Sequence, residues 1–187
     1  VVIGGAIEAT KKLAEKLDSP VCSGYQHNDS FPGSHPLAVG PLGYNGSKAA
    51  MELISKADVV LALGTRLNPF STLPGYGIDY WPKNANIIQV DINPDRIGLT
   101  KKVTVGISGD AKLVAEQIFE KLSSNAGDTD RQARKDLIHQ TKSAWLQKLS
   151  SLDHEEDDPG TVWNKDARDR DKDRMSPRQA WRAIQAG

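Results

Sequence analysis

Residues that could bind an anionic or hydroxylated ligand follow two apolar segments of the sequence. Gly64, Thr65 and Arg66 come directly after one apolar run, and Asp91 stands at the end of the next. Gly64 lets backbone approach a ligand closely, Thr65 offers a hydroxyl, and Arg66 offers planar N–H donors that match a phosphate, carboxylate or sulfonate. Asp91 stands where a carboxylate can hold a ribose hydroxyl. These four residues form the candidate cofactor-binding set.

Two of these residues have a structural interpretation that the sequence leaves open. Arg66 could cap a surface loop, and Asp91 could cap the turn that Asn93-Pro94 opens. Neither His27 nor His35 has a partner at metal-ligand spacing, so a surface or loop-packing role is the favoured interpretation for each. The sequence contains neither a G-x-G-x-x-G fingerprint nor a phosphate loop. It therefore assigns no catalytic residue and no metal ligand.

The apolar runs that precede the candidate residues are typical of buried parallel strands. The loops that follow the carboxyl ends of such strands commonly bind ligands. Strands alternate with amphipathic helices at intervals of roughly 25 residues, which predicts an α/β fold. We expect a doubly wound, Rossmann-like parallel sheet with helices on both faces over residues 1–122. The expected strands cover 19–23, 58–63, 86–92 and 103–107, and the expected helices 7–17, 46–56 and 111–122.

Helix caps and the first residues give more local expectations. Asn45 is expected to cap the second helix and Asp110 the third. The pattern of Val1 to Ala6 predicts the last part of a strand, followed by a turn at Gly4-Gly5. Because natural chains seldom begin inside a buried strand, we expect the sequence to be a fragment. Gly4-Gly5 could also receive a phosphate at a helix N-terminus.

Beyond residue 122 the pattern changes. We expect residues 123–174 to form a helix, over 131–149, and a charged connector. The acidic residues of 153–158 are expected to be solvated rather than metal-bound. Ser176 and Pro177 open a further helix, at the start of a segment, 175–187, that ends before a core could form.

Composition excludes some partners and favours others. Lys and Arg together number 24, as do Asp and Glu, so no basic surface for nucleic acid or an anionic membrane is expected. The single cysteine, Cys22, cannot form an internal disulfide, which fits a reducing cytoplasm. We expect Cys22 to be a small core residue.

Two long loops, 24–45 and 64–84, are unusual for a compact domain. Both are rich in glycine and proline, and both carry aromatic side chains. Loops of this length are uncommon without a function. We therefore expect them to line a ligand site or a subunit contact.

A family resemblance rests on four features of the sequence. They are His35-Pro36-Leu37, the glycines Gly40, Gly43 and Gly46, the run Ala57 to Arg66, and Ile88-Gln89-Val90-Asp91-Ile92-Asn93-Pro94. Together they resemble the central domain of thiamine-diphosphate enzymes of the acetolactate synthase type. Three further segments, 67–82, 153–161 and 175–181, are similar to the branch of this family that transfers an acetyl group from sulfoacetaldehyde to phosphate.

This resemblance implies a cytoplasmic enzyme with small-molecule substrates, sulfoacetaldehyde and phosphate, and with acetyl phosphate and sulfite as products. Thiamine diphosphate and Mg²⁺ would be held by a preceding and a following domain, the second of which begins within 175–187. The complete protein would be a homo-oligomer, and this chain alone would be inactive.

Acetolactate synthases bind FAD on their central domain, but Asn68-Pro69-Phe70 replaces their charged cluster after the arginine, which argues against FAD. The alternatives are a fragment of an acetolactate synthase-like carboligase and a stand-alone nucleotide-binding module.

Overall fold

The computed structural model describes residues 1–122, 130–151 and 183–184. Its contacts divide the chain into two units, Val1–Lys142 and Ser143–Gly187, and every strand described belongs to the first unit. The strands are β1 (Val21–Ser23), β2 (Ala38–Pro41), β3 (Val59–Leu63), β4 (Asn86–Asp91) and β5 (Val105–Ser108). The helices are α1 (Ile7–Leu17), α2 (Lys48–Ile54), α3 (Ala111–Lys121) and α4 (Arg131–Ser151), and short 3₁₀ turns form at Asn28–Ser30, Pro69–Ser71 and Pro94–Arg96.

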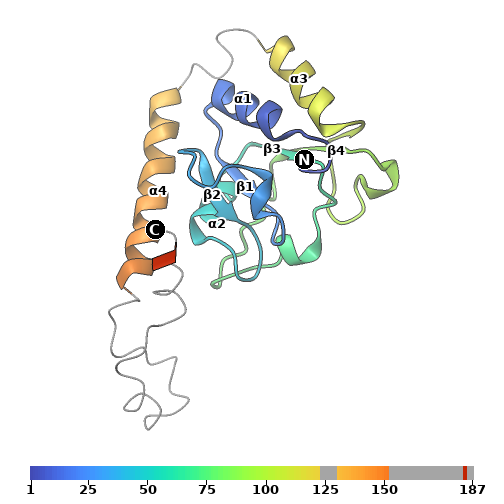
Figure 1. Ribbon diagram of the computed structural model, residues 1–187. Coiled ribbons are helices and arrows are strands. Elements are labelled where there is room, and N and C mark those ends of the chain that lie inside the picture. Colours follow the sequence, from blue (N-terminus) through green and yellow to red (C-terminus); the bar gives the residue numbers. More distant parts are fainter. Residues whose placement is uncertain (123–129, 152–182, 185–187) are drawn as a thin grey trace. The chain divides into compact units, whose positions relative to one another are not determined.

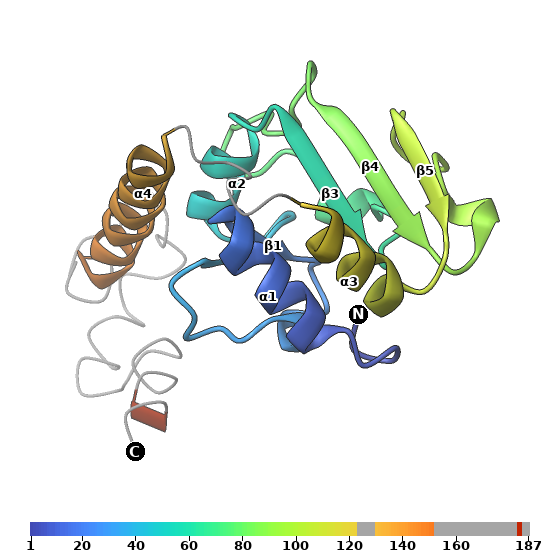
Figure 2. The same cartoon turned by 90° about the horizontal axis from the view of Figure 1, so that it is seen from above.

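The described strands pair in parallel, in two hydrogen-bonded groups. β1 pairs with β2 (Figure 1), and β3, β4 and β5 form a three-stranded sheet in that order (Figure 2). Between β3 and β4 the register is unbroken from Val59 opposite Asn86 to Leu63 opposite Val90. The expected parallel α/β fold is confirmed, with its strands in two groups.

Helices cover both faces of β3. The side chains of Leu61 and Leu63 pack with α1 and α3, which lie side by side (Figure 2). Val60 points to the opposite face, where it joins the cluster that contains α2. This alternation follows from the two-residue period of a strand, and it places one apolar layer on each side of the sheet.

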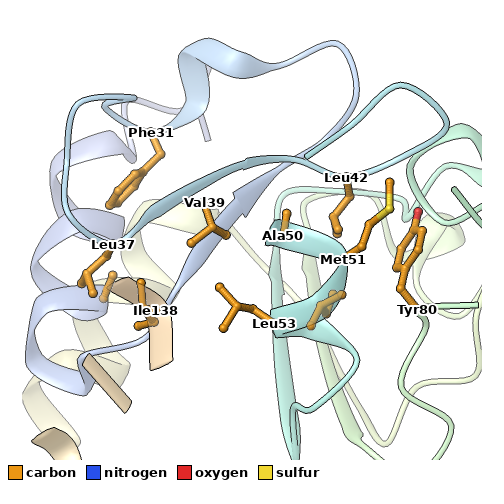
Figure 3. Close-up of a cluster of buried hydrophobic side chains, with 11 residues drawn as sticks. Phe31, Leu37, Val39, Leu42, Ala50, Met51, Leu53, Tyr80 and Ile138 are labelled. Carbon is orange, nitrogen blue, oxygen red and sulfur yellow. The ribbon is translucent and has the colours of Figure 1, made fainter. Parts of the chain in front are cut away.

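The larger core cluster lies around α2 and the two long loops (Figure 3). Met51 and Tyr80 are its most deeply buried large side chains, and the Tyr80 hydroxyl donates to the carbonyl of Ser71 at 3.1 Å. Burial raises the pKa of Tyr80 to about 12 and that of the Cys22 thiol to about 11. Cys22 is partly buried and packs against this core cluster, in line with the role expected for it.

Three spaced glycines let the loop after β2 pack tightly. A Cβ at Gly40 would lie 2.7 Å from the Cβ of Ser47, and one at Gly46 would collide with the carbonyl of Pro41. At Gly43, where φ is +113°, a Cβ would collide with the carbonyl of Phe70. The motif thus brings the loops after β2 and β3 into direct backbone contact.

Some expectations for the first 50 residues are wrong. Val1 to Ala6 form turns rather than a strand, and the amide of Ala6 donates to the carbonyl of Val1 at 2.9 Å. The expected loop 24–45 contains β2, a short segment that owes its strand geometry to pairing with β1. Asn45 is not the cap of α2, because the Ser47 side chain accepts from the amide of Ala50.

The expected cap of α3 is confirmed. The Asp110 carboxylate caps α3 by accepting from the amides of Lys112 and Leu113 at 2.9 and 3.1 Å.

The acidic segment 153–158 and the helix expected from Ser176 fall almost wholly outside the described residues. Among the described residues, no helix is both long and apolar enough to cross a membrane.

A buried carboxylate fixes the first turns of α4 to the end of α1. Asp18, which ends α1 in a left-handed conformation, pairs with Arg131 and with Lys135. Arg131 and Arg134 also donate to carbonyls of the last turn of α1. Burial would raise the pKa of Asp18, but the hydrogen bonds and charges of Arg131 and Lys135 outweigh it and hold the pKa below its ordinary value.

The glycine contacts predict the effect of a single methyl group. Gly43→Ala is expected to lower the free energy of unfolding by about 3 kcal/mol, because the left-handed backbone disfavours a side chain and the new Cβ meets the Phe70 carbonyl. Gly33→Ala is the matched control, since no atom lies within 4 Å of the added Cβ. Urea unfolding measures both, and equal stability of the two variants would contradict the packing role.

Candidate functional site

The structure brings the candidate residues together at one edge of the three-stranded sheet. β3 and β4 end side by side, and the amide of Gly64 donates to the carbonyl of Val90 at 2.8 Å. Across β4, the amide of Gly109 donates to the carbonyl of Asp91 at 3.1 Å. The loops that follow β3, β4 and β5 therefore meet in a continuous rim, which we call the carboxyl rim.

Gly64, Thr65 and Arg66 form the part of the carboxyl rim that follows β3. Gly64 has φ +58°, and a Cβ there would lie 3.0 Å from the backbone nitrogen of Val1. The Thr65 hydroxyl accepts from the amide of Leu67 at 3.2 Å, which shapes a loop in which Leu67 also has positive φ. Arg66 is exposed, and its guanidinium has no ion pair or hydrogen bond to the described part of the chain.

Asp91 lies below the surface of the carboxyl rim. It is 4% exposed, and its Oδ1 accepts from the amide of Asn93 at 2.9 Å. Asn93 in turn caps the 3₁₀ turn at Pro94–Arg96 by accepting from the amide of Asp95. The structural interpretation of Asp91 thus has a direct contact in its support, while ribose binding stays a prediction.

Gln89 organises the carboxyl rim, although the sequence analysis did not single it out. Its side chain is 1% exposed, and its Nε2 donates to the carbonyls of Thr65 at 2.9 Å and Arg96 at 3.1 Å. Its Oε1 accepts from the amide of Gly98 at 2.8 Å. The signal in the sequence was an amide side chain between the apolar residues Ile88 and Val90, since a buried amide must find partners.

Charges are divided unevenly around the carboxyl rim. Asp110 already occupies the N-terminus of α3, and a Cβ on Gly4 would lie 3.1 Å from its Oδ2. The N-cap residue of α1, by contrast, is Ala6, and no side chain caps that helix. An anion at the N-terminus of α3 would meet the Asp110 carboxylate. The Arg66 guanidinium offers an anion a more favourable contact.

The remaining polar and hollow features lie away from the carboxyl rim. One hollow, of about 170 Å³, lies between β1, β2 and the loop at Asn28, and a more open one, of about 540 Å³, lies over α1 and α3. His35 packs edge-on against Phe31 and pairs with Glu15 at 3.1 Å, which confirms the loop-packing interpretation. Among the described residues, no group of three or more His, Cys, Asp or Glu could hold a metal ion.

Comparison with known families gives this arrangement a context. Residues 1–118 match the family described as the central domain of thiamine pyrophosphate enzymes. The chain belongs to this family. The X-ray structure of a putative thiamin diphosphate-dependent enzyme isolated from Mycobacterium smegmatis matches 65% of this chain and 23% of that one, with a TM-score of 0.51 and 27% identity.

Individual relatives match most or all of the chain. A probable sulfoacetaldehyde acetyltransferase from Rhizobium meliloti (strain 1021) is 78% identical over 100% of this chain, and a sulfoacetaldehyde acetyltransferase from Roseovarius nubinhibens is 74% identical over 100%. A probable acetolactate synthase large subunit from Methanocaldococcus jannaschii is 34% identical over 81%. The chain spans only 32%, 31% and 23% of these three relatives.

The described residues do not by themselves fit thiamine diphosphate with its metal. Diphosphate groups are commonly bound through Mg²⁺ and oxygen ligands, and the described part of the chain offers no cluster of such ligands. No catalytic step is therefore assigned to Gly64, Thr65, Arg66 or Asp91.

The contacts of Gln89 make the carboxyl rim testable. Gln89→Leu is expected to lower the free energy of unfolding by about 3 kcal/mol, because two carbonyls and one amide lose their partner. The control is Gln117→Leu, the same change at an exposed position of α3. Chemical denaturation measures both variants, and a Gln89 variant as stable as the control would show that the side chain does not organise these loops.

Proposed function

We propose that this chain is the central domain of a sulfoacetaldehyde acetyltransferase, which converts sulfoacetaldehyde and phosphate to acetyl phosphate and sulfite with thiamine diphosphate. The observation that carries the proposal is the gap in identity between two groups of relatives. Relatives with this name are 78%, 74% and 68% identical over the whole chain, whereas an acetolactate synthase large subunit is 34% identical over 81% of it.

The proposal extends to the organisation of the full-length protein. Residues 1–122 would be the central domain, 123–174 a helix with a charged connector, and 175–187 the beginning of the domain that binds thiamine diphosphate. Mg²⁺ would be held by parts of the protein outside this chain. We further propose that the complete protein is a cytoplasmic homo-oligomer, which fits its small-molecule substrates and the balanced charge of this chain.

Activity of the full-length protein tests this proposal. With thiamine diphosphate and Mg²⁺, it is expected to release sulfite from sulfoacetaldehyde only when phosphate is present, and to form acetyl phosphate in equal amount. Sulfite is measured with a thiol-exchange dye and acetyl phosphate as its hydroxamate. Turnover of pyruvate to acetolactate, without sulfite release from sulfoacetaldehyde, would favour the carboligase alternative instead.

The isolated chain provides the complementary control. Because thiamine diphosphate and Mg²⁺ would be held by parts of the protein outside this chain, the 187-residue chain is expected to release no sulfite under the same conditions. Measurable release would mean that the reactive centre lies within this sequence.

A narrower proposal concerns the carboxyl rim. We propose that Gly64, Thr65 and Arg66 bind the phosphate of an adenine nucleotide, with Asp91 as the ribose ligand. The exposed guanidinium of Arg66 beside a glycine of positive φ supports the phosphate contact. The burial of Asp91 means that a ribose contact would require movement of the turn at Asn93.

Equilibrium dialysis with ADP, NAD and FAD tests nucleotide binding at the carboxyl rim. Arg66→Ala is expected to weaken ADP binding about tenfold, because a charge-assisted contact to phosphate is lost. Lys56→Ala removes an exposed cation just before β3, at the opposite end of that strand, and should leave binding unchanged. Absence of binding by the unaltered protein at millimolar nucleotide would retire this proposal and leave the acetyltransferase proposal untouched.

A further inference from the structure

Large apolar side chains are exposed on three neighbouring loops of the first unit. We call this surface the aromatic face, and its members follow the carboxyl ends of β1, β2 and β3. They are Tyr25, Tyr44, Phe70, Leu73 and Tyr76, with 39%, 65%, 62%, 43% and 55% of each residue exposed. Solvent-exposed aromatic groups gathered in this way are typical of surfaces that another protein segment covers.

Direct contacts between the three loops hold the aromatic face in place. The amide of Tyr25 donates to the Oγ of Ser71 at 3.1 Å, and the hydroxyl of Tyr76 donates to the carbonyl of Gly46 at 3.2 Å. Beneath them, the buried Tyr80 donates to the carbonyl of Ser71. Because these loops are tied to one another and to the core, the exposed rings are presented on a preformed surface.

The chemistry of the aromatic face favours a protein partner over a charged substrate. No charged residue occurs between Leu67 and Ile78, or between Pro36 and Ser47. A sulfonate or phosphate would find no cation within these segments. Depletion of charge together with enrichment of Tyr and Phe is the composition expected at the centre of a buried interface.

We propose that, in the full-length protein, the aromatic face is buried against a part of the same polypeptide that lies outside residues 1–187. Two relatives that match the whole chain are about three times as long, since the chain spans 32% and 31% of them. Polypeptide of that length is tethered to the face at a high effective concentration, which favours it over a second copy. The proposal does not depend on which reaction the full-length protein catalyses.

Tyrosine nitration of the native full-length protein tests whether the face is covered. The chain contains four tyrosines, of which Tyr25, Tyr44 and Tyr76 are exposed in this structure and Tyr80 is buried. With tetranitromethane and peptide mass mapping, the expected result is loss of nitration at Tyr44 and Tyr76, as at Tyr80. The same protein in urea shows that all four sites can react. Rapid nitration of Tyr44 and Tyr76 in the native protein would overturn the proposal.

Photo-crosslinking identifies what covers the face. The photoreactive residue p-benzoylphenylalanine replaces Phe70, an exposed position that tolerates a larger ring, and Leu113 on α3, which is 57% exposed, reports the background. The expected product from position 70 migrates as a single polypeptide, with a crosslinked peptide from outside residues 1–187. A crosslink between two copies, or none above the Leu113 background, would overturn the proposal.

Discussion

The hydrogen-bonded register between β3 and β4 is the constraint on which the candidate site depends. Five consecutive pairs, from Val59 opposite Asn86 to Leu63 opposite Val90, make both strands end at the same level. Gly64 and Asp91 are neighbours for this reason alone. A slip of one residue would exchange the two faces of β3, so that Leu61 and Leu63 would leave α1 and α3. Burial on both faces therefore fixes the position of the carboxyl rim.

Parallel pairing aligns strand ends, but it does not fix the loops that follow them. Gln89 does so for β3 and β4, because one buried amide group satisfies a carbonyl of the first loop and two backbone groups of the second. Gly43 does so for β2 and β3, because only a residue without a Cβ permits contact with the Phe70 carbonyl. Gln89 places a polar side chain in the core, whereas Gly43 works because it has no side chain.

The parts of the fold predicted from sequence are those governed by short-range periodicity. β3, β4, α1 and α3 have strong apolar patterns. Asp110 is an N-cap residue whose hydrogen-bond partners lie within three residues of it. β2 has no such pattern, and its strand geometry depends on pairing with β1, seventeen to eighteen residues earlier in the chain. The burial of Asp91 and the contacts of Gln89 likewise depend on a turn that closes only in three dimensions.

This division explains why the sequence could indicate the family more readily than the chemistry of the domain. Its distinctive segment, the loop after Arg66, is uncharged from Leu67 to Ile78, and its buried members Leu67, Thr72 and Tyr80 anchor it to the core. Such a loop is built for packing, since it offers a ligand few charged or metal-binding groups. The features that set this domain apart are therefore the buried side chains that anchor its loops.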